Sequence, residues 1–339
     1  MWFDPAVKTV LDGAEVLASA RGPRELEQLT AELLGAELYR AVHEERQGLR
    51  FDLWLGELIT ATAARAREGA GSAYLLLHGL ASVATPGFAS VALAERDQLR
   101  RSMGGRGVPA WLYDLPKIAA TGEVHRMRDT YGTRFAVIAG FAYPGGTDRS
   151  VFLFDIDASG FVRLAGAGVH DDLDQAAGAW CARTGSQASP HLVTDPQQLL
   201  CLVHCDVDDE PIMGDESRPV LDNWFRAQRR IHDLAEALRQ KGMPLPANES
   251  LYHDLDTAPM VEQFGDWYAA SHGTRPDLEA VEALAEEWMS GTLPETWFSV
   301  SPRRIEFLLE LIGDWIPDDP VTLEVKSLLP EWVRWLSER

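Results

Sequence analysis

Apolar side chains along the first hundred residues recur with a helical period. Between residues 24 and 45, leucines follow one another at steps of three and four, which places them on one face of an α-helix. Residues 4–103 are therefore expected to form successive helices that bury one face each. The same spacing predicts further helices over Asp52–Arg67, Ser72–Ala84 and Phe88–Met103.

Beyond residue 105 the pattern changes to short segments rich in Val, Ile and Phe. Turn residues such as Pro144-Gly145-Gly146 and Ser159-Gly160 separate these segments. A helix over Asp172–Arg183 is expected to lie across one face of the resulting sheet. The strands are expected over Glu123–Tyr131, Arg134–Tyr143, Ser150–Asp157 and Phe161–Val169.

Helical spacing returns after residue 218 and continues to the C-terminus. Ser301 followed by Pro302 is typical of a helix cap and first helical residue. The sequence thus predicts an α+β fold, mostly helical, with a small three- or four-stranded antiparallel meander in the middle. We expect an N-terminal helical region (1–104), a sheet with a covering helix (105–217) and an acidic helical region (218–339).

The segment AYLLLHG, residues 73–79, has the form of a strand that leads into the oxyanion hole of α/β-hydrolases. Those enzymes also need a nucleophile elbow, Gly-x-Ser-x-Gly, which this chain lacks. The apolar residues here repeat with helical steps, and Thr85-Pro86-Gly87 predicts the end of a helix. We therefore expect a buried helix, with His78 in a core or a groove.

Negative charge is concentrated in the C-terminal part of the chain. The net charge is −21, and residues 201–339 carry 28 Asp and Glu against 12 Lys and Arg. Such a surface repels phosphate backbones and anionic lipids, so we expect no direct binding to nucleic acid and none to membranes. A basic protein partner or a metal ion is favoured instead.

Cysteine usage and the N-terminus predict a cytoplasmic protein. Cys181, Cys201 and Cys205 are an odd number in a large chain, which argues against a disulfide framework. The first twenty residues lack the basic start and apolar run of a signal peptide. No segment reaches the roughly 18 apolar residues of a membrane span.

Two segments have recognisable forms. The tail SPRRIEFLLELIGDWIP...LLPEWVRW occupies residues 301–335, and the hairpin VFLFDIDASGFV occupies residues 151–162. The tail resembles the closing helix pair of a group of uncharacterised actinobacterial proteins, and the hairpin resembles their central hairpin. The resemblance implies an α+β arrangement with helices on either side of a small sheet, and it brings no activity or catalytic residue.

The string Asp155-Ile-Asp157-Ala-Ser159-Gly160 matches the beginning of a calcium loop. It offers oxygen ligands at positions one, three and five and a glycine at position six. Position twelve is Gly166, where such loops carry a bidentate Glu. A hairpin turn in which Asp and Ser bind their own backbone is the simpler prediction, and calcium is the alternative.

Two further clusters contain metal-ligand chemistry. On a helix Cys201, His204 and Cys205 would share a face, and with Asp206 they offer zinc its preferred ligands. The alternative is a pair of buried free cysteines that lead into a solvated acidic loop. The string His170-Asp171-Asp172 stands where a strand meets a helix, and helix capping alone explains its carboxylates. The candidate metal ligands are His170, Asp172, His204, Cys205 and Asp206.

No set of these residues forms a complete catalytic constellation. We therefore expect a non-catalytic protein–protein interaction or scaffold protein without a cofactor. Trp267, Tyr268 and Trp297 are the candidate anchors for its protein partner. The alternative is a metal-dependent enzyme in which the His, Asp and Cys groups converge on zinc or calcium.

Overall fold

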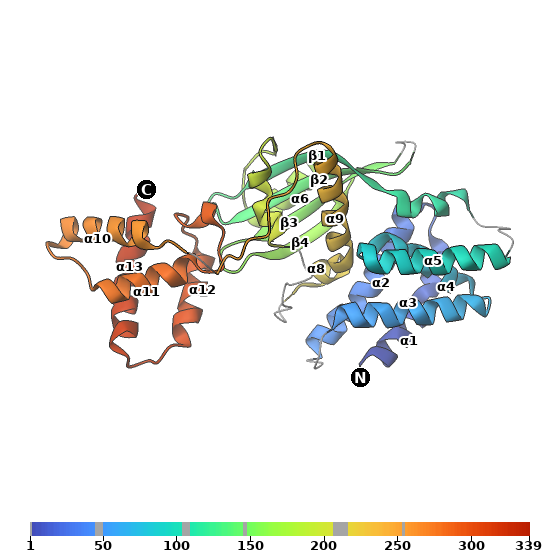
Figure 1. Ribbon diagram of the computed structural model, residues 1–339, viewed down its shortest axis with the longest axis horizontal. Helices are drawn as coiled ribbons and strands as arrows, with labels where there is room; N and C mark the ends of the chain where they lie inside the picture. Colours follow the sequence, from blue (N-terminus) through green and yellow to red (C-terminus); the bar gives the residue numbers. More distant parts are fainter. Residues whose placement is uncertain (1, 45–49, 104–108, 145–147, 206–215, 253–254) are drawn as a thin grey trace.

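The computed structural model describes residues 2–44, 50–103, 109–144, 148–205, 216–252 and 255–339. It confirms a mostly helical α+β fold, in which an antiparallel sheet stands between two groups of helices (Figure 1). Short helical segments connect the main elements: η1 (Ala14–Ser19), η2 (Ala110–Tyr113), η3 (Leu115–Lys117), η4 (Pro196–Leu199), α7 (Leu200–Val203) and η5 (Pro294–Thr296).

The N-terminal helices follow the predicted apolar pattern. Leu26, Leu34 and Leu38 are buried on one face of the second helix, as their spacing predicts. The segment around His78 is a helix buried on nearly all sides, so the hydrolase-like strand is absent there. The helices are α1 (Phe3–Gly13), α2 (Pro23–His43), α3 (Phe51–Arg67), α4 (Gly71–Val83) and α5 (Pro86–Met103).

The sheet has the strand order β4-β3-β2-β1-β5, with antiparallel pairing throughout. Four strands coincide with the predicted meander, and β5 adds a short edge of two residues beside β1. The predicted meander does not include β5, because a segment of two residues is too short to show the pattern of a strand. The strands are β1 (Ala119–Arg128), β2 (Arg134–Ala142), β3 (Arg149–Asp157), β4 (Arg163–His170) and β5 (His191–Leu192).

The two faces of the sheet belong to different cores, because successive side chains of a strand point to opposite sides. Phe135 and Val137 of β2 join the N-terminal helices and α9 (Trp224–Gln240) in the first core. Ala136 and Ile138 pack instead against Trp180 of α6 (Leu173–Thr184). Helix α6 thus covers one face, as predicted, while α9 and α8 (Arg218–Asp222) belong to the opposite side.

Residues 255–339 form a separate group of helices with a second hydrophobic core, which we call the C-terminal unit (Figure 1). The division of the chain into domains stays a prediction. The packing nevertheless joins α9 to the first core, whereas the sequence pattern grouped all residues from 218 onward. The helices of the unit are α10 (Ala258–His272), α11 (Leu278–Met289), α12 (Pro302–Gly313) and α13 (Pro320–Ser337).

Polar contacts and one aromatic cluster join the C-terminal unit to the sheet. The guanidinium of Arg126 on β1 lies 2.5 Å from a carboxylate oxygen of Glu295. Arg128 donates to the backbone oxygen of Glu295 and to the hydroxyl of Ser299, each at 3.0 Å. On the hairpin between β3 and β4, the ring of Phe161 lies 4.9 Å from that of Phe307, centroid to centroid.

Candidate functional site

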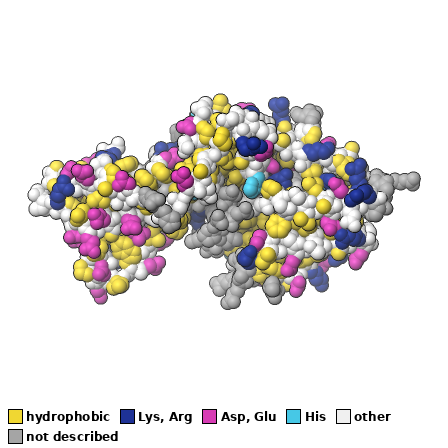
Figure 2. Space-filling view, viewed as in Figure 1, with side chains coloured by type: hydrophobic (Ala, Val, Ile, Leu, Met, Phe, Trp, Pro, Cys, Tyr) yellow, Lys and Arg dark blue, Asp and Glu magenta, His cyan; other side chains and the backbone are white. Residues whose placement is uncertain are grey.

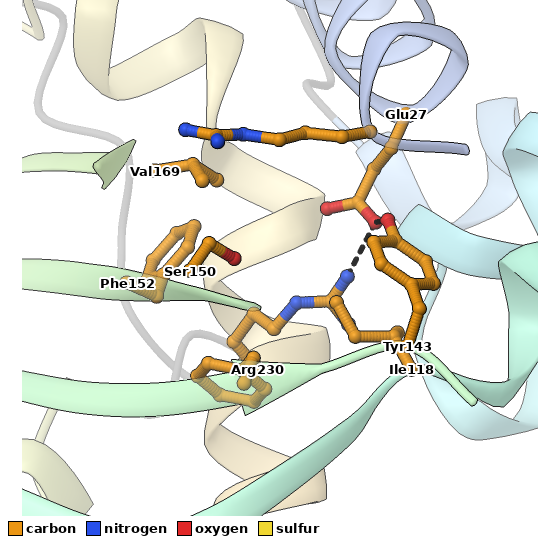
Figure 3. Close-up of a pocket in the computed structure, with 9 residues that line it drawn as sticks. Glu27, Ile118, Tyr143, Ser150, Phe152, Val169 and Arg230 are labelled. Atoms are coloured by element: carbon orange, nitrogen blue, oxygen red, sulfur yellow. Dashed lines mark hydrogen bonds and ion pairs between the residues drawn. The ribbon is translucent and has the colours of Figure 1, made fainter. Parts of the chain in front are cut away.

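A small polar hollow lies where α2, the sheet and α9 meet (Figure 3). Its space of about 10 Å³ is close to what one water molecule needs. Its apolar wall comes from Ile118, Phe141, Phe152 and Val169, and its polar wall from Arg24, Glu27, Tyr143, Ser150 and Arg230.

Glu27 is the centre of this polar wall and is only 2% exposed. Its Oε2 accepts hydrogen bonds from Arg230 at 2.6 Å, from the Tyr143 hydroxyl at 2.9 Å and from the Ser82 hydroxyl at 3.0 Å. Its Oε1 lies 3.8 Å from a guanidinium nitrogen of Arg226. One carboxylate therefore ties α2 to α4, to the end of β2 and to α9.

The electrostatics of this cluster keep Glu27 ionised. Burial opposes ionisation, but Arg230 and Arg226, helped by the hydrogen bonds from Tyr143 and Ser82, outweigh it and lower the pKa of the carboxyl. Burial and the neighbouring carboxylate raise the pKa of Tyr143. A low-pKa carboxylate beside a protonated phenol is poorly suited to exchanging protons near neutral pH. The cluster fits a structural role better than a catalytic one.

The predicted metal ligands fall at two places in the chain, the junction of β4 with α6 and the end of α7. His170 ends β4, and Asp172 caps α6 by accepting from the backbone nitrogen of Gln175 at 2.8 Å, which confirms the capping prediction. His204 and Cys205 follow α7, and Asp206 lies outside the described residues.

Within the described ranges, no three His, Cys, Asp or Glu side chains come together as a metal site. Burial lowers the pKa of both His170 and His204, so each ring is neutral at pH 7. Cys205 is fully buried. Burial also raises the pKa of Cys201 to about 11, so its thiol is protonated at neutral pH.

The calcium-like string turns its first carboxylate away from the loop and into the protein. Asp155 is fully buried and accepts from Arg134 at 2.8 Å and from the indole of Trp180 at 2.9 Å. Arg183 of α6 lies 3.1 Å from the other carboxylate oxygen. A Cβ atom at Gly166 would lie 2.0 Å from that guanidinium. The glycine at position twelve therefore gives Arg183 room to reach Asp155.

The rest of the string forms the predicted turn. The backbone nitrogen of Ser159 donates to the carboxylate of Asp157 at 3.0 Å, and the Ser159 hydroxyl also contacts this carboxylate. Asp157 is thus engaged with its own hairpin, and Asp155 with two arginines. These two carboxylates do not face a common ion.

The predicted partner anchors Trp267, Tyr268 and Trp297 are half-buried in the C-terminal unit. Trp267 stacks on Phe264, and its indole donates to Glu338 at 2.9 Å. The backbone oxygen of Trp297 accepts from the indole of Trp288 at 2.7 Å. These aromatic residues therefore hold the unit together and expose only part of their surface to a partner.

The surface of the C-terminal unit is strongly acidic (Figure 2). Residues 255–339 include 17 Asp and Glu against 6 Lys and Arg. On α11, Glu279, Glu282 and Glu286 are exposed and spaced by three and four residues, so they share one face of the helix. This face offers a row of carboxylates to a cationic partner.

Among the described residues, none of the helices combines the length and the apolar character that a bilayer crossing requires. Comparison of the chain with family models, curated proteins and solved structures finds no match.

Proposed function

We propose that this protein is a non-catalytic interaction or scaffold protein whose C-terminal unit binds a basic protein partner. The observation that carries the proposal is the acidic surface of a helical unit with its own core. Charge complementarity of this kind raises the rate of association and selects for cationic partners.

The ion pairs of the buried carboxylates outside the C-terminal unit support this proposal. The carboxylates of Glu27 and Asp155 are held by internal arginines, so they are committed to the fold. No grouping of His, Cys and acidic side chains in the described ranges favours the metal-dependent alternative. The carboxylates of Glu279, Glu282 and Glu286 on α11, in contrast, face solvent.

The test is a capture experiment with the full chain and a charge-neutralised variant. The variant carries Glu279→Gln, Glu282→Gln and Glu286→Gln on α11. We expect the wild-type chain to retain lysine- and arginine-rich proteins at low salt and to release them at about 0.5 M salt, where the Debye length is only a few ångströms. The variant should retain at least threefold less.

A control variant removes equal charge from the exposed surface of the first core, through Asp4→Asn, Glu57→Gln and Glu68→Gln. It should retain partners like the wild type. If the partner remains bound to the α11 variant, or is lost equally from the control, then the acidic face of the C-terminal unit is not the binding surface.

A further inference from the structure

Three large aliphatic side chains are exposed around the connection between α12 and α13. Leu309 is 48% exposed, Ile316 is 74% exposed and Leu323 is 55% exposed. Leu309 lies in the last turn of α12 and Leu323 in the first turn of α13, so each is within roughly 6 Å along the helix axis of the connection that carries Ile316. We call these three residues the turn surface.

The exposed aliphatic residues of the first core are farther apart along the chain. Val16, Leu53 and Val91 lie on η1, α3 and α5, whereas the turn surface belongs to one pair of successive helices and their connection. Single apolar residues on a surface are ordinary, whereas several gathered at one place and surrounded by polar groups mark an interaction site. Three exposed aliphatic side chains around one connection make the turn surface a candidate for the second kind.

Carboxylates lie next to the residues of the turn surface in the sequence. Glu306, Glu310, Asp314 and Asp318 are all exposed on α12 or on the connection. One arginine, Arg303, lies 3.5 Å from Glu306 and 3.6 Å from Glu310, so it is shared between two acids. Figure 2 shows hydrophobic and acidic side chains side by side on this unit.

The acidic and apolar side chains of this region together indicate which kind of molecule could bind there. A second copy of the chain would bring carboxylates against carboxylates, and anionic lipid would be repelled for the same reason. A helix with an apolar stripe and flanking Lys or Arg satisfies both features at once. We propose that the turn surface is the docking site for a basic amphipathic helix of a protein partner. This inference rests on the proposed function and adds the place and the form of the partner.

The probe is a synthetic 18-residue amphipathic helix of Leu and Lys, titrated against the full chain by fluorescence anisotropy. A scrambled peptide of the same composition keeps the charge and loses the apolar stripe. We expect the amphipathic peptide to bind at least tenfold more tightly than the scrambled one. Ile316→Ser should weaken that binding about tenfold, since burying one aliphatic side chain is worth about that factor.

Matched controls have similar exposure at other places. Leu309→Ser is compared with Leu53→Ser on α3, which is 49% exposed, and Leu323→Ser with Leu278→Ser on α11, which is 61% exposed. Only the turn-surface variants should lose affinity, by fivefold to tenfold each.

Two results would overturn the inference in different ways. If both peptides bind equally and the turn-surface variants bind like the wild type, association depends on charge alone; the docking site is then wrong while the acidic unit still binds cations. If neither peptide binds even at low salt, the proposed docking site is wrong. The acidic surface then does not bind cationic partners either, which contradicts the proposed function.

Discussion

The two cores of the molecule accommodate buried guanidinium groups in different ways. In the first core, Arg226 and Arg230 face the carboxylate of Glu27. In the second core, Arg304 is 2% exposed and, among the described residues, has no carboxylate partner. It donates instead to the backbone oxygens of Trp288 and Thr296, each at 2.7 Å, and its guanidinium carbon lies 4.4 Å from the Trp288 ring centroid.

A buried guanidinium group therefore has a different structural role in each core. The first core uses a paired charge to join α2, α9 and the sheet, which are far apart in the sequence. The second uses a lone cation at the end of α11, where the carbonyls of the last turn and the helix dipole favour positive charge. Burial lowers the pKa of Arg304 to about 9, so the group is still charged at pH 7. Among the described residues, no carboxylate of the C-terminal unit pairs with Arg304. The acidic side chains of this unit are therefore not needed to neutralise its buried cation.

The largest expected effect follows from removing the carboxylate of the first core. Glu27→Ala removes the ion-pair partner of the buried Arg226 and leaves Arg230 with Asp233 alone, and we expect the free energy of unfolding to fall by about 3–5 kcal/mol. Urea unfolding measures this loss. The control, Glu25→Ala, removes an acid whose side chain is 50% exposed, and should change stability by less than about 0.5 kcal/mol. A loss below about 1 kcal/mol for Glu27→Ala would show that the ion network does not hold the first core.

A smaller effect is expected in the second core. Arg304→Met keeps an apolar stem but leaves the carbonyls of Trp288 and Thr296 without their donor, which should cost about 2–3 kcal/mol. Hydrogen exchange should locate the loss in α11 and α12 and leave the first core protected. The neighbouring Arg303→Met, whose parent side chain is 47% exposed, is the control. If protection falls equally in both cores, the two cores unfold as one cooperative unit, and Arg304 does not stabilise the second core by itself.

Much of this fold is predictable from local sequence pattern. The leucine steps of α2, the apolar run of β2 and the Ser301-Pro302 start of α12 each appear where the sequence places them. The steps of α2 reflect one buried helix face, and the apolar run of β2 reflects a strand buried on both faces. The Ser301 hydroxyl accepts from the backbone nitrogen of Arg304 at 3.1 Å, as a helix cap should.

The charged clusters were not predictable in the same way. Nothing local in the sequence marks Arg226 and Arg230 as buried, yet both are. Helix α9 packs on the sheet as well as on α2 and α4, so it buries more of its circumference than one apolar stripe. Glu27 gives a weak signal, since it stands directly beside Leu26 on the buried side of α2. Its partners lie about 55 to 203 positions away, a separation that no local pattern reports.

The smallest expected effect is a loss of stability in the first core at acidic pH. His78 in the first core is fully buried, and its Nδ1 donates to the backbone oxygen of Leu112 at 3.0 Å. Burial, with a smaller contribution from Arg96, lowers the pKa of His78 from 6.5 to about 3. The unfolded chain therefore takes up a proton below pH 6.5 while the folded chain does not. Stability is complete above that pH and declines as the pH falls, by about 1 kcal/mol between pH 6.5 and 5.5.

Unfolding of the first core, followed over this pH range, measures the slope. His78→Asn should remove it whatever the variant does to absolute stability, because the amide does not titrate. His43→Asn, at an exposed position, should retain the wild-type slope. If the two variants show the same slope, the acid sensitivity comes from groups other than the buried imidazole. The paired charges of Glu27, Arg226 and Arg230 would then remain as the electrostatic difference between the two cores, because the buried His78 would contribute nothing to the response.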